Sequence, residues 1–209
     1  MKYKFYFRKS SFKKDIKNAN LLLKLIKENK PSHFLEIGIL EGATSRNICE
    51  LLNIMNEGDF SFTGIDLFGD DVDNNDLKEF TPISYKISNP FKWIYFKLIL
   101  RMNPNSLECV KFLLRKFKNS INLHKGYSRD ILNKINLSNI DFVFLDGGHS
   151  YDTVKEDLKL LKTKLTNKSV IVCDDYNISE YGVKKAVDEI KEECKFIDLG
   201  RFAFLEINK

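Results

Sequence analysis

Short apolar segments alternate with amphipathic helical patterns along most of the chain, and this alternation limits the fold more than any other feature. The segments that we predict as buried strands are residues 33–38, 60–67, 121–124, 141–146 and 169–174. Helical spacing of apolar residues predicts helices over residues 12–29 (capped by Ser11), 43–53, 151–165 and 183–190. Such alternation predicts an α/β fold, a mainly parallel sheet with helices on both faces.

The chain ends in two more predicted strands, 196–199 and 202–207, which surround Gly200. Two strands so close together predict an antiparallel hairpin, which brings the expected sheet to seven strands. We expect a basic N-terminal helical segment over 1–30, followed by one domain over 31–209.

Residues 68–120 interrupt the alternation between the second and third strands. The stretch is too long for a plain loop in a compact domain, so we expect a helical insertion that acts as a lid or as a binding segment. Its aromatic side chains are suited to stacking on a sugar or aromatic ring, although such a stripe is more often part of a core or of an interface between identical chains. These residues are Phe91, Trp93, Tyr95 and Phe96.

Charge is distributed in blocks along the 209 residues, which carry a net charge of +5. Residues 1–30 hold ten lysines and arginines against two acids, and residues 86–118 hold eight against Glu108 alone. An acidic stretch over 66–79 lies between them. Such blocks can steer anionic partners. No nucleic-acid motif accompanies them, so solvated helix faces are favoured and no nucleic-acid partner is expected.

The sequence predicts a cytoplasmic protein. No apolar run approaches the roughly 20 residues of a membrane-spanning helix, and the N-terminus lacks the apolar core of a secretory signal. The four cysteines (Cys49, Cys109, Cys173 and Cys194) form no CxxC pair, which is typical of reduced thiols rather than a disulfide framework or a zinc site.

A glycine loop follows the first predicted strand. Gly38 and Gly42 allow a ligand to approach the backbone closely, and Thr44 and Ser45 open the next helix, where free N–H groups attract an anion. Asp66 ends the second strand and suits the two hydroxyls of a ribose. The pattern predicts a nucleoside-containing ligand, although GxxxG is not the dinucleotide fingerprint and the glycines also fit a simple tight turn.

Three carboxylates are predicted to crowd one edge of the sheet. Asp146 ends the fourth strand, while Asp174 and Asp175 end the fifth. Neighbouring strands lie about 4.8 Å apart, so the charges would repel unless a cation neutralised them. Oxygen ligands favour Mg²⁺, Mn²⁺ or Ca²⁺, whereas helix caps or lysine partners are the structural alternative. His149 follows in the same turn and is a candidate general base.

The runs FLEIGILEGATS, GIDLF, FVFLDGGHSYDTVKEDL and VIVCDDY resemble class I S-adenosylmethionine-dependent methyltransferases. The resemblance is to the branch that contains macrocin- and mycinamicin-type sugar O-methyltransferases and cephalosporin hydroxylase-like proteins. It covers residues 32–68 and 121–190 and leaves 1–30 and 69–120 largely unmatched. It implies a Rossmann-like methyltransferase fold.

The resemblance also implies the roles of individual residues. The cofactor S-adenosylmethionine would be held by Glu36, Gly38, Gly42, Thr44, Ser45, Asp66, Gly126, Tyr127, Ser128 and Asp146. Asp146, Asp174 and Asp175 would bind Mg²⁺ or Mn²⁺, and His149 would act in catalysis with Asp146. Gly148 stands where many relatives have an acid or a small polar residue.

The function implied is a divalent-metal-dependent O-methyltransferase that methylates a hydroxyl of a small polyhydroxylated acceptor, such as a sugar or a glycosylated metabolite. Two alternatives stay open: a catechol-type phenolic O-methyltransferase, and a peripheral membrane or partner-binding module with a relict cofactor fold. A nicotinamide oxidoreductase is disfavoured because GxGxxG is absent. Self-association is also open.

Overall fold

The computed structural model describes residue 8 and residues 15–69, 87–166 and 168–207. Seven strands form one sheet in the order β3-β2-β1-β4-β5-β7-β6. The strands are β1 (His33–Ile37), β2 (Ser61–Asp66), β3 (Ile121–Lys125), β4 (Phe142–Leu145), β5 (Val170–Cys173), β6 (Cys194–Leu199) and β7 (Phe202–Ile207). Strands β1 to β5 pair in parallel, whereas β7 is antiparallel to β5 and β6. The predicted α/β sheet with its C-terminal hairpin is confirmed.

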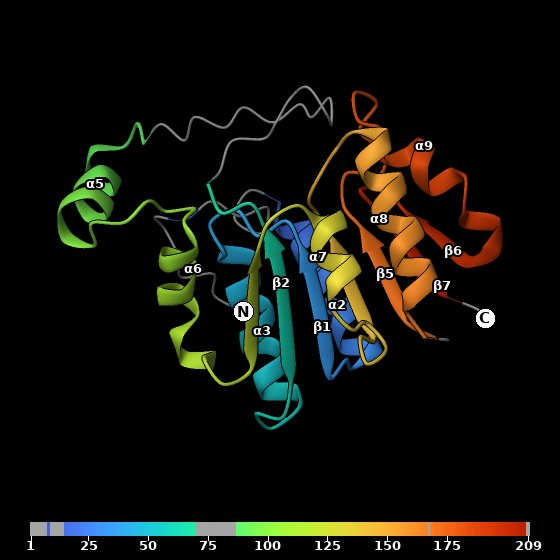
Figure 1. Cartoon of the computed structure of the whole chain (residues 1–209), viewed down its shortest axis with the longest axis horizontal. Coiled ribbons are helices and arrows are strands. Elements are labelled where there is room, and N and C mark those ends of the chain that lie inside the picture. Colours follow the sequence, from blue (N-terminus) through green and yellow to red (C-terminus); the bar gives the residue numbers. More distant parts are fainter. Residues whose placement is uncertain (1–7, 9–14, 70–86, 167, 208–209) are drawn as a thin grey trace.

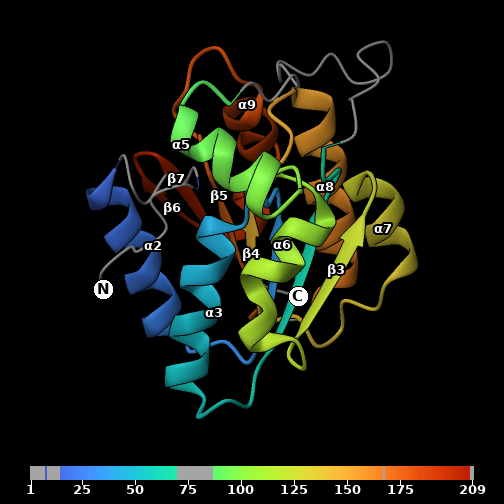
Figure 2. The same cartoon turned by 90° about the vertical axis from the view of Figure 1, so that its left-hand side faces the viewer.

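Helices cover both faces of this sheet. They are α2 (Ile16–Asn29), α3 (Ala43–Met55), α7 (Ser128–Lys134), α8 (Tyr151–Lys164), α9 (Val183–Asp188) and the short 3₁₀ turn η3 (Lys191–Glu193). Figures 1 and 2 show α2 and α3 on one face and α7 and α8 on the other. None of the helices in the described residues has both the length and the apolar character needed to span a membrane.

Alternation along β1 explains the two apolar layers. Phe34 packs on the α2 and α3 side, where its ring stacks on Phe62 and Phe142 with centroids 6.0 and 5.1 Å apart. Leu35 and Ile37 pack on the opposite side, with α7, α8 and α9. Successive side chains of a strand point to opposite faces, so an apolar run is required when helices cover both.

The helix predicted over residues 12–29 begins later in the structure. Helix α2 starts at Ile16, and its N-cap is Asp15, whose carboxylate accepts a hydrogen bond from the Asn18 N–H at 3.1 Å. The predicted cap, Ser11, lies outside the described residues. The buried side of α2 packs into the same apolar layer as α3 and the strands.

The insertion after β2 contains helices, as predicted. It contains α5 (Pro90–Trp93), the π-helix η1 (Ile94–Ile99), α6 (Leu107–Leu114) and the 3₁₀ turn η2 (Arg115–Phe117). Figure 1 shows α5 at the edge of the molecule, beyond α6. Of the predicted aromatic stripe, Phe96 is buried while Phe91 and Trp93 are exposed. Most of the acidic stretch, residues 70–79, lies outside the described residues.

Candidate active site

The loops that follow β1 and β4 meet at the carboxyl end of the sheet. Gly38 has φ +92°, and a Cβ built on it would lie 2.0 Å from the backbone oxygen of Asp146. Its N–H donates to the Ile65 carbonyl of β2 at 2.9 Å. Only glycine permits this approach, so the two loops that carry the predicted donor and metal residues are in direct contact.

Asp66 shapes the glycine loop with its carboxylate. One oxygen accepts hydrogen bonds from the N–H groups of Ile39 at 2.7 Å and Leu40 at 3.0 Å, and the other accepts from Phe68 at 2.6 Å. Leu40 has φ +54°, a left-handed conformation that a leucine adopts only when its surroundings enforce it. The structure therefore places Asp66, the acid predicted to hold the ribose, against the glycine loop.

Glu36 is a fully buried carboxyl beneath this loop. Within the part of the chain that the structure describes, neither of its oxygens has a hydrogen-bond partner, and the same holds for the buried hydroxyl of Ser45. Burial raises the pKa of Glu36 from 4.5 to about 8, and the Asp66 charge adds to this rise. The Ser45 hydroxyl lowers the pKa in part, although its geometry is not that of a hydrogen bond. A buried acid without partners is costly unless a ligand satisfies it.

The segment predicted to flank adenine lies beside Asp66. Gly126 donates its N–H to the Asp66 carbonyl at 3.0 Å, and its φ of +146° turns the chain from β3 toward α7. Tyr127 is the N-cap of α7, and Ser128 is its first residue. Thr44 is buried in the first turn of α3. The structure thus brings the predicted donor residues together around the ends of β1, β2 and β3.

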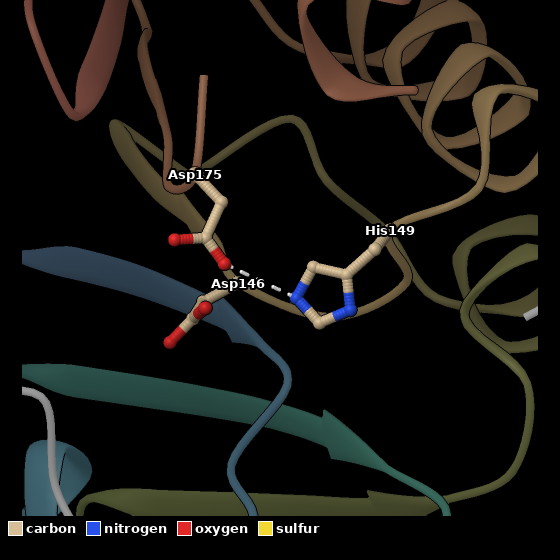
Figure 3. A group of neighbouring side chains, drawn as sticks. All are labelled: Asp146, His149 and Asp175. Carbon is tan, nitrogen blue, oxygen red and sulfur yellow. Dashed lines mark ion pairs between the residues drawn. The ribbon is translucent and has the colours of Figure 1, made fainter. Parts of the chain in front are cut away.

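Asp146, His149 and Asp175 form a second cluster (Figure 3). One ligand atom from each lies within 4.8 Å of the others, and His149 Nε2 is 3.3 Å from Asp175 Oδ2. The pKa of Asp146 is raised well above its ordinary value, first by burial and then by the charges of Asp174 and Asp175. Asp175 also has φ +57°, the kind of backbone strain that concentrates at functional sites.

Asp174, the third expected metal ligand, is held by Arg201 from the turn between β6 and β7. The guanidinium donates two hydrogen bonds to this carboxylate, one of them from Nη2 to Oδ2 at 2.6 Å. The same Nη2 lies 2.9 Å from Asp175 Oδ1, an ion pair without hydrogen-bond geometry. Burial nevertheless keeps the pKa of Asp174 above its usual value, while the carboxylates raise the pKa of Arg201.

Arg201 was not among the residues predicted for the site. Its only sequence signal is its position after Gly200 in the hairpin turn. Pairing of Cys173 with Ala203 brings that turn to the carboxyl end of β5, where the two aspartates lie. This placement depends on an antiparallel register that the sequence does not specify, so the arginine could not be assigned to the site beforehand.

Comparisons with known proteins identify the family of the chain. A family model described as a methyltransferase domain matches residues 35–176. The chain belongs to this methyltransferase family. The match includes both the glycine loop and the Asp146–Asp175 cluster, and it confirms the methyltransferase resemblance and the assignment as an enzyme. A comparison with curated protein sequences finds no match.

Solved structures share the fold of this methyltransferase. The O-methyltransferase NovP has 16% identity and a TM-score of 0.61, covering 94% of this chain and 80% of its own. CalS11, a calicheamicin methyltransferase, has 17% identity and a TM-score of 0.63, with 95% and 80% covered. TomG from Streptomyces achromogenes, solved with S-adenosylmethionine, has 15% identity and a TM-score of 0.60, with 92% and 80% covered. At identities this low, the structural similarity establishes a common fold and no more.

The loop after β5 completes the surroundings of His149 in the methyltransferase. The Tyr181 ring lies against the imidazole with centroids 4.3 Å apart, and Gly182 donates its N–H to the His149 carbonyl at 2.8 Å. Tyr181 also borders an open cavity of about 670 Å³. The cavity is lined by Asn177, Ile178, Ser179, Tyr181, Lys184, Lys185, Asp188 and Glu189.

Proposed function

We propose that this methyltransferase transfers the methyl group of S-adenosylmethionine to a hydroxyl of a small polyhydroxylated acceptor, a sugar or a glycosylated metabolite, with a divalent cation in the site. The observation that carries the proposal is the contact between the two halves of the site. The glycine loop at Gly38 touches the backbone of Asp146, whose side chain belongs to the acid–histidine cluster. A donor in the loop and an acceptor at the cluster would therefore be neighbours.

The donor half fits a cationic nucleoside ligand. S-adenosylmethionine supplies an activated methyl group on a sulfonium and also carries an ammonium group. The unpartnered Glu36 carboxylate would accept hydrogen bonds from that ammonium, which would lower the raised pKa of Glu36 and restore its charge. Asp66 would hold the ribose, and the segment from Gly126 to Ser128 would flank the adenine.

The acceptor half fits a divalent cation. Asp146 and Asp175 offer carboxylate oxygens close to one another, which are ligands that Mg²⁺ and Mn²⁺ prefer. A bound cation would supply Lewis acidity that lowers the pKa of a coordinated hydroxyl. His149 would accept the hydroxyl proton, and Tyr181 would hold the imidazole plane in place. Asp174 would join the ligands only after leaving Arg201.

A sugar acceptor is favoured by one of the structural neighbours. CalS11 is described as a TDP-rhamnose 3′-O-methyltransferase, and its apo structure has a TM-score of 0.61 with this chain at 15% identity. The cavity beside Tyr181 has polar and charged residues in its lining, among them Asn177, Ser179 and Asp188, and these are suited to hydrogen bonds with an acceptor that carries several hydroxyls. We expect the reaction in the cytoplasm, since the four cysteines are free thiols.

Calorimetry with S-adenosylmethionine, S-adenosylhomocysteine and NAD, each with and without Mg²⁺, tests the donor site. We expect binding of the two sulfur compounds and none of NAD; absence of binding by both sulfur compounds would refute the proposal. The Glu36→Gln variant is the matched probe, because it removes the charge that should recognise the ammonium while keeping the side-chain shape. We expect it to weaken binding of both sulfur compounds.

Turnover tests the acceptor site. The His149→Ala variant should bind S-adenosylhomocysteine like the wild type but lose methyl transfer to nucleotide sugars by roughly 100-fold or more, the usual contribution of a general base. A mild loss would instead favour the catechol-type reaction, in which chelation of both hydroxyls by the metal replaces much of the need for the base.

A further inference from the structure

The outer side of the insertion exposes an unusual number of large apolar side chains. Among the described residues, nine such side chains are exposed, and five of them fall between residues 90 and 99. We call these five the insertion patch: Phe91 (71% exposed), Trp93 (45%), Ile94 (44%), Leu98 (57%) and Ile99 (66%). The other four, Ile16, Leu40, Ile54 and Ile197, belong to different elements. A concentrated apolar surface of this kind marks a binding face.

The inner side of the same segment is firmly attached to the protein. Phe96 is fully buried, with the Arg8 guanidinium 5.0 Å from its ring centre. Lys92 forms an ion pair with Glu41 of the glycine loop at 2.9 Å, and the Glu41 side chain has no exposed surface. The insertion patch is therefore the outward face of an anchored helix and not an unfolded segment.

Exposed basic residues lie within and just after the segment that carries the insertion patch. Lys97 and Arg101 are exposed, and the sequence has no acidic residue between Lys86 and Glu108. Arg8 donates hydrogen bonds to the carbonyls of Pro104 and Cys109, which ties this point of the basic N-terminal segment to the insertion. A second copy of the chain docking through the same face would bring like charges together, so self-association through it is disfavoured.

We propose that the insertion patch binds an anionic lipid surface. Apolar and aromatic side chains with lysine and arginine around them are typical of helices that lie in the interface of a membrane. Each basic side chain near an anionic bilayer strengthens the attachment, and salt weakens it. Because Lys92 joins the insertion to the glycine loop, a lipid surface bound here would lie beside the donor half of the active site. Lipid binding at the insertion patch would not depend on the chemistry of the proposed reaction.

The single tryptophan of the chain, Trp93, belongs to the insertion patch and reports on its surroundings directly. We expect vesicles of phosphatidylglycerol and phosphatidylcholine to shift its emission to shorter wavelength and to co-sediment the full-length protein. Pure phosphatidylcholine vesicles should do neither, and high salt should reverse both effects. The Leu98→Glu/Ile99→Glu double variant should bind the anionic vesicles at least tenfold more weakly.

Ile54→Glu is the matched control, since Ile54 is as exposed as Phe91 but lies near the end of α3. It should bind vesicles like the wild type; equal losses in this control and in the double variant would overturn the proposal. Binding to neither kind of vesicle, or equally to both, would also overturn it. Light scattering tests whether the insertion patch instead binds a second copy of the chain. A wild-type dimer that becomes a monomer in the double variant, together with no vesicle binding, would assign the patch to self-association and refute the lipid proposal.

Discussion

At the scale of single residues, Glu36 is the position at which we expect stability to depend on ligand binding. Alternation along β1 directs this side chain to the same face as Phe34, and its position at the strand end places it beneath the glycine loop. A buried acid without partners lowers the stability of the folded chain whenever it must be charged. This arrangement is understandable if the residue serves a cationic ligand rather than the fold.

The raised pKa of Glu36 sets the direction of a pH dependence. Its folded-state pKa of about 8 lies above the ordinary 4.5, so the folded state keeps a proton that the unfolded state has released. In the ligand-free protein, the contribution of Glu36 to the free energy of unfolding should be largest below about pH 4.5 and should be lost as pH rises toward 8. Differential scanning calorimetry between pH 5 and 8 measures the loss, which has an upper limit on the order of 4 kcal/mol.

The Glu36→Gln variant should have a flatter profile and a higher Tm than the wild type at pH 8. Equal slopes in the two proteins would contradict the buried, unpartnered state of this carboxyl. Saturating S-adenosylhomocysteine serves as a control, because an ammonium beside Glu36 should reduce the difference between pH 5 and pH 8 in the wild type.

Arg201 is the second residue with a clear expected effect. The Asp174 side chain is 1% exposed, so removal of its partner leaves a buried acid uncompensated. Arg201→Gln should lower the free energy of unfolding by roughly 3 kcal/mol. Arg201→Lys should recover only part of this, because an ammonium cannot reproduce the two-pronged contact. Urea unfolding measures both variants.

Millimolar Mn²⁺ should then raise the Tm of Arg201→Gln by more than that of the wild type, since Asp174 is released to join Asp146 and Asp175. An equal Tm increase in both proteins would show that Arg201 does not compete with the cation for Asp174.

At the scale of elements, the turn between β1 and α3 depends on glycine for two separate reasons. Gly38 has a positive φ, and a Cβ at this position would lie only 2.0 Å from the Asp146 carbonyl oxygen. Gly200, in the turn between β6 and β7, has only the first of these features, since its φ is +80° and the space around it is open. Gly38→Ala should therefore abolish binding of S-adenosylhomocysteine and cost several kcal/mol of stability. Gly200→Ala should cost about 1 kcal/mol from backbone strain alone and leave binding intact. Calorimetry and thermal unfolding separate the two, and equal effects would argue against the close contact between the loops after β1 and β4.

At the scale of the whole molecule, segments that are distant in the sequence support the outer side of the glycine loop. Lys92 of the insertion neutralises the buried Glu41, and Arg8 donates a hydrogen bond to the Glu41 carbonyl at 2.8 Å. The loop is thus held between the sheet on one side and two segments outside the sheet on the other. Donor binding should consequently respond to changes in the insertion.

Lys92→Met tests this coupling. The substitution keeps an unbranched side chain but removes the Lys92 ammonium from the buried Glu41 carboxylate, so we expect a loss of up to roughly 3 kcal/mol in stability. The affinity for S-adenosylhomocysteine should fall as well. Lys24→Met is the control, because its ion pair with Glu28 is solvent-exposed and should contribute less than about 1 kcal/mol. Unchanged ligand affinity in Lys92→Met would show that the insertion does not support the glycine loop.

Local pattern alone was enough to predict the order and type of the main elements. The buried strands β4 and β5 were expected within one residue of their ends, because an apolar run bounded by polar residues reports on burial directly. The glycine loop, Asp66, Asp146, His149 and Asp175 were all expected near the carboxyl edge, since parallel strands bring their ends to one side. Their individual roles stay predictions.

Only the tertiary structure could decide which groups compensate those acids. Arg201 lies 27 positions from Asp174, and Lys92 lies 51 positions from Glu41. Such pairs depend on strand register, on the hairpin turn and on the path of the insertion, none of which leaves a periodic trace in the chain. Residue order therefore determined the sheet and the acids at its edge. Long-range packing decided that one aspartate is held by an arginine and that Glu36 has no hydrogen-bond partner among the residues the structure describes.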